Sequence, residues 1–170
     1  MAKVSYMALK ILALWLALFL INHMLFGLAV VHGESMEPTL WEGDVLICRK
    51  SPGFEPCRND VVLCRTGKGY ENELVKRVIG LPGDEINIQE NGTVCVNGKP
   101  ETVISNKEGN RMGDVSYPFT VPQGQYYVMG DNRAVSLDSR YSEIGTIPKE
   151  KIDGKVLRCI FSPKYFRKIN

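Results

Sequence analysis

Histidine is scarce in this chain of 170 residues, which has only His23 and His32. His23 lies inside an uncharged apolar segment, and we interpret His32, which follows that segment, as a polar residue at a membrane–water boundary. Neither belongs to a cluster with cysteine, and the sequence has no C-x-x-C spacing. The pattern argues against a structural zinc site and against a catalytic Ser–His or Cys–His pair. We expect no metal and no other cofactor.

A large excess of charge of either sign is also missing. The formal net charge is +2, which is too small to indicate nucleic acid as a partner. Internal repeats and low-complexity tracts are absent. The chain is instead rich in turn formers, with 16 glycines and 9 prolines, and this favours short strands over long helices.

Charged side chains are absent from residues 11–31. A helix needs about 20 apolar residues to cross a bilayer, and Lys3 and Lys10 precede this segment, which favours a cytoplasmic N-terminus. We therefore expect a cytoplasmic segment at 1–10, a single transmembrane anchor at 11–31 and an extracytoplasmic domain at 32–170. A cleavable signal peptide is the alternative, since Gly27-Leu28-Ala29 offers small residues for a cleavage site. Both interpretations export residues 32–170.

The five cysteines suit an oxidising compartment, and their odd number leaves at least one outside an intrachain disulfide. Cys48 and Cys64 occupy equivalent places in two similar segments, GDVLICR and NDVVLCR. A disulfide between these two and a pair of half-buried thiols are both open at this stage. The pairing of the full set stays unassigned: Cys48, Cys57, Cys64, Cys95 and Cys159.

Short strands separated by turns dominate the pattern after residue 31. Apolar and β-branched residues follow turn formers repeatedly, and Asn91-Gly92 is typical of a tight hairpin turn. We predict a mainly β domain with a folded-over antiparallel or barrel-like sheet, in which the similar segments 43–49 and 59–65 pair as neighbours. Residues 105–117 are expected to form an exposed loop. The predicted strands are 43–49, 59–65, 74–80, 125–131 and 155–163, with a hairpin over 84–100.

A nucleophilic serine in a chain without a suitable histidine needs another base. Lysine can serve when it is neutral, which requires its pKa to fall from about 10.4 to about 7–8. Burial among apolar groups supplies such a shift. Lys76 lies in ELVKRVIGLPGD, where a strand would place it on one face with Leu74 and Val78. Ser35, in the turn-like stretch VHGESMEPTL, is the candidate partner.

Three blocks of this sequence resemble the signature blocks of type I signal peptidases, which are membrane-bound Ser–Lys proteases. The blocks GESMEPTL, VKRVIGLPGD and MGDNRAVSLDSR occur in the family's order behind an apolar N-terminal segment. The resemblance implies that Ser35 is the nucleophile and Lys76 the general base. It also implies that Ser136 hydrogen-bonds the lysine amine and that Asp138 and Arg140 form a supporting ion pair.

The resemblance assigns shaping roles to further residues. It implies that Asp131 and Asn132 form the turn presenting the third block, and that Met36 and Pro38 set the backbone around the nucleophile. Gly33 stands where some relatives carry a serine, so backbone or water must complete the oxyanion hole. Two simpler readings stay open: a plain surface pair at positions 138 and 140, and a mere turn at 131–132.

The implied function is an endopeptidase that removes signal peptides from exported preproteins at the bacterial cytoplasmic membrane. Its expected partners are preproteins with small residues before the cut and the lipid bilayer, without nucleic acid; the oligomeric state is not predicted. Three rivals remain: a peptidase dedicated to one pilin, conjugation or surface substrate, a self-cleaving repressor-type Ser–Lys protease, and a non-catalytic membrane-anchored β-domain.

Overall fold

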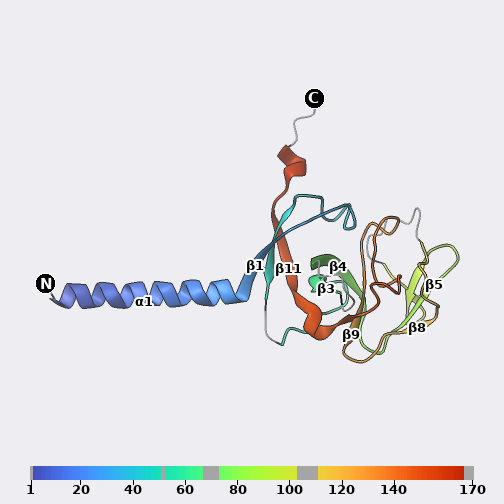
Figure 1. Ribbon diagram of the computed structural model, residues 1–170, viewed down its shortest axis with the longest axis horizontal. Coiled ribbons are helices and arrows are strands. Elements are labelled where there is room, and N and C mark those ends of the chain that lie inside the picture. The colour runs from blue at the N-terminus through green and yellow to red at the C-terminus, as the bar shows by residue number, and fades with distance from the viewer. Residues whose placement is uncertain (1, 51–52, 67–72, 103–110, 167–170) are drawn as a thin grey trace.

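A computed structural model describes residues 2–50, 53–66, 73–102 and 111–166 of the chain. The N-terminal helix α1 (Ala2–Leu25) extends away from the two β-sheets that form the rest of the molecule (Figure 1). Strand β1 (Phe26–Val30) follows it directly and pairs antiparallel with β2 (Val45–Arg49). Within the described residues, no helix has both the length and the hydropathy needed to cross a bilayer.

The helix and the expected transmembrane anchor, 11–31, have different bounds. The helix already includes residues 2–10, and it ends at Leu25 because Phe26–Val30 finds a strand partner in β2. An uncharged apolar segment can form either a helix or a strand. Here the pairing with β2 makes residues 26–30 a strand.

A seven-stranded antiparallel sheet carries most of the fold. Its strands run in the order β1-β2-β11-β3-β4-β9-β10. The expectation of a mainly β domain built on an antiparallel sheet is confirmed. The further strands of this sheet are β3 (Val61–Arg65), β4 (Glu73–Gly80), β9 (Gln125–Met129), β10 (Ile147–Pro148) and β11 (Ile152–Phe161).

The expected pairing of segments 43–49 and 59–65 is wrong. Both form strands, β2 and β3, but the ten-residue strand β11 lies between them and pairs with each. Lys155 of β11 is opposite Arg49 on one side and Val62 on the other. Two similar local sequences indicate that both segments form strands. Which strand each of them pairs with depends on distant parts of the chain.

The second sheet lies at the end of the molecule opposite α1 (Figure 1). Its order is β7-β6-β5-β8, and the predicted hairpin is confirmed by the antiparallel pairing of β5 with β6 across Asn91-Gly92. Of the loop expected at 105–117, residues 111–117 form no helix or strand, and 105–110 lie outside the described residues. The remaining elements are β5 (Glu85–Ile88), β6 (Val94–Val96), β7 (Lys99–Pro100), β8 (Phe119–Thr120) and the 3-10 helices η1 (Lys149–Lys151) and η2 (Pro163–Phe166).

Two hydrophobic clusters lie on opposite faces of strands β3 and β4, because alternate strand residues point to opposite sides. The Met36 cluster holds Ala29, Val31, Met36, Leu40, Leu46, Cys48 and Leu63, with Val75 packed against it. The Val78 cluster holds Val62, Cys64, Val78, Tyr126, Val128, Ile144 and Ile147, with Leu74 packed against it.

All five cysteines are free thiols. Cys48 belongs to the Met36 cluster and Cys64 to the Val78 cluster, so the sheet separates them. The structure therefore decides between the two open readings of this pair in favour of separate thiols, and both side chains are fully buried rather than half-buried.

Candidate active site

Lys76 lies in the middle of β4 and only 3% of its surface is exposed. It is opposite Val62 of β3, and it shares its strand face with Leu74 and Val78. This apolar setting is the one the sequence predicts. Burial lowers the pKa of Lys76 below its ordinary value, against the opposing effect of the Asp138 carboxylate.

Ser35 meets this lysine from the loop that follows β1. The Lys76 Nζ and Ser35 Oγ atoms lie 2.8 Å apart, within hydrogen-bond distance. The next residue, Met36, is 1% exposed in the cluster that bears its name, and its carbonyl accepts a hydrogen bond from the Leu40 N–H. The loop that carries Ser35 is thereby anchored one residue after the serine. Pro38 is exposed within this loop.

Gly33 is exposed and adopts a φ of 77°, in the left-handed region that favours glycine. No described side chain lies near its Cα hydrogens, since a Cβ built there would meet nothing within 4 Å. The Ser35 N–H donates to none of the described residues. It is therefore available to an incoming group.

The third block holds the serine through its backbone. The Asn132 N–H donates to the Ser35 carbonyl at 3.0 Å, and the Asn132 carbonyl accepts from the Ser136 N–H at 3.0 Å. Gly130 packs so tightly against the Ser35 carbonyl and the Ser136 side chain that a Cβ would overlap both. The turn at 130–132 thus contacts Ser35 directly, which explains the need for glycine at position 130.

Ser136 does not make the hydrogen bond to Lys76 that the resemblance implies. Its Oγ is buried and has no hydrogen-bond partner among the described residues. The lysine amine is turned toward Ser35 instead. A buried hydroxyl without a partner is costly, so this oxygen is ready to accept a hydrogen bond if a donor approaches.

Asp138 and Arg140 form a two-pronged ion pair in which both side chains are 0% exposed. The Arg140 Nε lies 2.8 Å from Asp138 Oδ1, and Nη2 lies 2.9 Å from Oδ2. Asp138 also accepts from the Gly130 N–H at 3.0 Å. The reading of these residues as a plain surface pair is wrong, because the pair is buried and tied to the turn that contacts Ser35.

Asp131 has partners that the sequence did not reveal. It is fully buried, and the Arg77 guanidinium contacts both of its oxygens at 2.7 and 2.5 Å. Thr39, from the loop that carries Ser35, donates its hydroxyl to the same carboxylate at 2.5 Å. Asp131 therefore joins three segments and is more than a turn residue. The only signal for Arg77 was its place beside Lys76, on the opposite face of the strand.

Two cavities meet at the Ser35–Lys76 pair. The first, of about 750 Å³, lies between β1 and the first half of β4, and His32 is also in its wall. The second, of about 500 Å³, is lined mainly by turn residues and by members of the Val78 cluster. Because β2, β11 and β3 separate β1 from β4 in the sheet, their shared cavity shows that the sheet curls.

Two strand edges are open inside the first cavity. Among the described residues, strand β1 pairs only with β2, and residues 73–76 of β4 pair only with β3, since pairing with β9 begins at Arg77. Such edges can receive an extended peptide. The described residues contain no group of three or more His, Cys, Asp or Glu that could hold a metal ion.

Comparisons with known proteins agree with this geometry. The family described as signal peptidase, peptidase S26, matches residues 4–161. Signal peptidase I of Bacillus amyloliquefaciens is 40% identical over 164 residues, covering 90% of this chain and 82% of the relative. Signal peptidase I T of Bacillus subtilis is 39% identical over the same shares, and signal peptidase IB of Staphylococcus aureus is 34% identical over 87% of this chain and 84% of the relative.

Among solved structures, a signal peptidase I of Enterococcus faecalis is similar with a TM-score of 0.49 and 28% identity, covering 62% of this chain and 98% of that one. The match over residues 4–161 and the 40% identity over most of the chain are decisive for its classification. This chain belongs to the signal peptidase family, peptidase S26.

Proposed function

We propose that this protein is a signal peptidase in which Ser35 is the nucleophile and Lys76 the general base. It is a serine endopeptidase that removes signal peptides from exported preproteins. The observation that carries the assignment of the two residues is the 2.8 Å contact between a buried lysine amine and a serine hydroxyl. A Ser–Lys dyad of this kind is known for the family.

The chemistry follows from the lowered pKa of Lys76. The neutral amine takes the Ser35 proton as Oγ attacks the peptide carbonyl carbon. The resulting ammonium then gives a proton to the leaving nitrogen, the C–N bond breaks, and an ester to Ser35 remains. Water hydrolyses this ester with the lysine again acting as base.

The negative charge on the carbonyl oxygen needs donors. The Ser35 N–H donates to no described residue and is the first candidate for this role. Gly33 offers no side-chain donor two residues earlier, so a second donor must come from backbone or water. The positive φ and the exposure of Gly33 leave the approach to the serine open.

The surrounding residues act on the dyad by position. Ser136 has a buried, unpartnered oxygen that can accept from Lys76 once the amine carries three protons. The Asp138–Arg140 pair fixes the Gly130 N–H, and Asn132 fixes the Ser35 carbonyl. Met36 anchors the nucleophile loop, with Pro38 shaping its exposed side, and Asp131 ties that loop to β4.

The substrate segment before the cut would lie in the first cavity as an added strand between β1 and β4. Backbone groups of the two open edges would supply affinity. Side chains of the Met36 cluster line this cavity, among them Ala29, Met36 and Leu63, and would leave room only for small residues next to the cut.

Members of this family are membrane-associated in bacteria. We place residues 1–10 of this chain in the cytoplasm, its apolar segment within 11–31 in the cytoplasmic membrane and residues 32–170 outside as the catalytic domain. Residues 11–31 carry no charged side chain, and apolar side chains of α1 such as Leu12 and Trp15 are more than 60% exposed. The bilayer is the partner that would cover them.

The named relatives are all signal peptidases, so neither a repressor-type protease nor a non-catalytic β-domain is favoured. An enzyme dedicated to one pilin, conjugation or surface substrate would use the same dyad, and the relatives give no reason to prefer it.

The test is incubation of the detergent-solubilised protein with an exported precursor, followed by N-terminal sequencing of the product. We expect a single cut after a small residue, and loss of that cut in Ser35→Ala and in Lys76→Ala. Lys99→Ala, which changes an exposed lysine of β7, is the matched control and should cleave normally. Cleavage by Lys76→Ala at the wild-type rate would remove the proposed mechanism.

A further inference from the structure

The two cavities at the dyad share Ser35, Leu74 and Lys76 and diverge from there. The first extends along the Met36 cluster, through residues such as Leu63 and Val75, and the second extends to Ile144 of the Val78 cluster. Among the described residues, only the first lies between the open edges of β1 and β4. The second is bounded by Gly33, Glu34 and Glu42 on one side and by Val135 and Leu137 on the other.

The position of the acyl segment identifies the cavity that faces the leaving group. The ammonium of Lys76 must reach the leaving nitrogen while the acyl carbon is bonded to Ser35 Oγ. Both cavities reach Ser35 and Lys76, and the segment before the cut occupies the first. The leaving nitrogen therefore departs toward the second cavity.

We propose that the second cavity binds the first residues of the mature chain, immediately after the cut, and selects them by charge. The inference rests on the proposed function of the dyad. The occupant is a short segment of the preprotein whose new amino group, with a pKa of about 7.7–8.0, is largely cationic at neutral pH.

The charges in the cavity wall complement such an occupant. Glu34 and Glu42 are exposed carboxylates, and among the described residues of the wall only Lys76 is basic. The apolar side chains of Val135, Leu137 and Ile144 form the rest of the surface. Lysine and arginine can lay their aliphatic stems on such a surface and present their charge at the rim. Acidic residues just after the cut would be repelled by both glutamates.

The test uses two peptides that share one cleavable segment and differ only in the two residues after the cut, Lys-Lys or Glu-Glu. We expect kcat/KM for the full-length protein in detergent to favour Lys-Lys by about three- to tenfold at low salt, as for exposed charge pairs. The double substitution Glu34→Lys/Glu42→Lys should abolish or reverse this ratio. Raising the salt concentration to about 1 M should shrink the ratio, because these charges are exposed to solvent.

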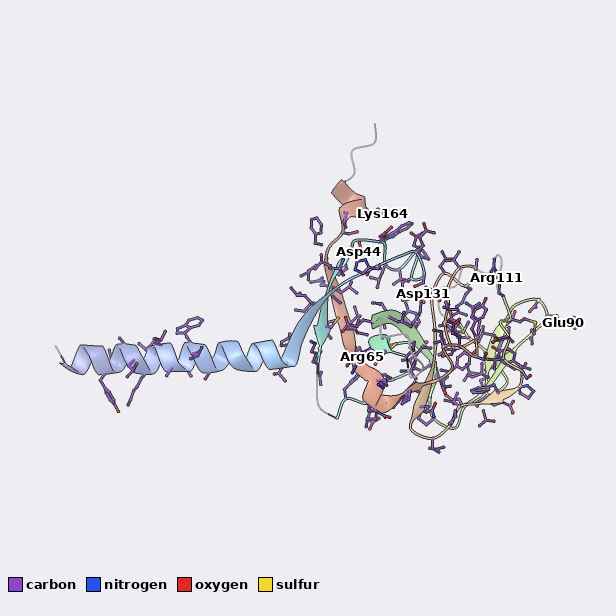
Figure 2. The ribbon with its side chains drawn as sticks, in the orientation of Figure 1. Asp44, Arg65, Glu90, Arg111, Asp131 and Lys164 are labelled. Atoms are coloured by element: carbon purple, nitrogen blue, oxygen red, sulfur yellow. The ribbon has the colours of Figure 1, made fainter. Side chains whose placement is uncertain are left out.

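The matched control is Glu85→Lys/Glu90→Lys, which changes the net charge equally at two exposed positions, one in β5 and one in the turn that follows it. Figure 2 shows Glu90 at the end of the molecule farthest from α1. This control should keep the wild-type ratio. An unchanged ratio in the Glu34/Glu42 variant, or an equal shift in the control, would overturn the proposal while leaving the dyad intact. Failure of the wild type to cleave either peptide or any precursor would instead refute the proposed function.

Discussion

Strand β4 carries two adjacent cationic residues that point to opposite faces of the seven-stranded sheet. On one face, Lys76 is surrounded by the Val78 cluster, and burial lowers its pKa. On the other, Arg77 contacts both oxygens of Asp131, and these hydrogen bonds raise its pKa. Figure 2 shows Asp131 in the interior of the β-domain. The surroundings of β4 thus disfavour a positive charge on Lys76 at one face and stabilise the positive charge of Arg77 at the other.

The difference assigns separate tasks to neighbouring residues. An amine that must accept a proton needs surroundings without a closely bound carboxylate. An ion pair that holds segments together needs a permanently charged cation that contacts its carboxylate through two atoms, and we call the Arg77–Asp131 pair the brace. Thr39 donates to the same Asp131 carboxylate, so the brace reaches the loop that carries Ser35. The register of β4 therefore positions the proposed base, Lys76, beside the Arg77 brace, and a one-residue slip would exchange their faces.

The comparison predicts its largest effect for Lys76→Met, which keeps the apolar packing and removes the base. We expect kcat to fall by about 10³-fold or more, the upper range for a general base, while the protein stays folded. Precursor cleavage and circular dichroism, measured on one preparation, separate the two effects. Activity within tenfold of the wild type would show that the amine is not the base.

The same variant tests the lowered pKa through stability. The folded state binds fewer protons than the unfolded chain between the lowered pKa of Lys76 and the ordinary value of 10.5. The free energy of unfolding of the wild type should therefore rise with pH across that window relative to Lys76→Met, and be lowest below the folded-state pKa. Urea unfolding at several pH values measures this difference, and a flat difference would contradict the assigned shift.

On the opposite face, Arg77→Met should mainly reduce stability. It leaves the fully buried Asp131 carboxylate without its cation, and breaking a buried pair in this way costs about 3–5 kcal/mol. Urea unfolding provides the measurement. Arg65→Met is the matched control, because it breaks the more exposed pair with Asp153 and should cost less than about 1 kcal/mol. Equal losses of stability in both variants would mean that the buried Arg77–Asp131 pair stabilises the fold no more than the exposed Arg65–Asp153 pair does.

Local pattern was sufficient for the longer strands of the domain and for one face of β4, but it missed β1, β8 and β10. Alternation around Lys76 predicted its burial with Leu74 and Val78, and Asn91-Gly92 predicted the hairpin. Contacts between distant segments were not predictable in this way. An example is β11, the most C-terminal strand described, which lies between β2 and β3 in the sheet.

Side-chain pairings around the site also depended on tertiary structure. Nothing in the local sequence says that Thr39 and Arg77 share the Asp131 carboxylate, since their positions are set by the packing of three separate segments. The expected Ser136–Lys76 hydrogen bond failed for a related reason. The direction of the lysine amine is set by the loop that carries Ser35, and the amine contacts Ser35 while the Ser136 oxygen has no partner among the described residues.

The smallest and sharpest effect is expected from Val62→Thr, which places a hydroxyl opposite Lys76 with almost no change in shape. A polar neighbour stabilises the ammonium, so the pKa of Lys76 should rise toward its ordinary value. Since the base acts when neutral, the rising acid limb of the kcat/KM–pH profile should move to higher pH by about 0.5–1 unit. Val61→Thr makes the same change one residue earlier, beside the Met36 cluster on the other face, and should leave the limb in place. If both variants moved the acid limb equally, the pKa of Lys76 would not depend on which face of β3 carries the new hydroxyl. The proposed difference between the two faces would then be wrong.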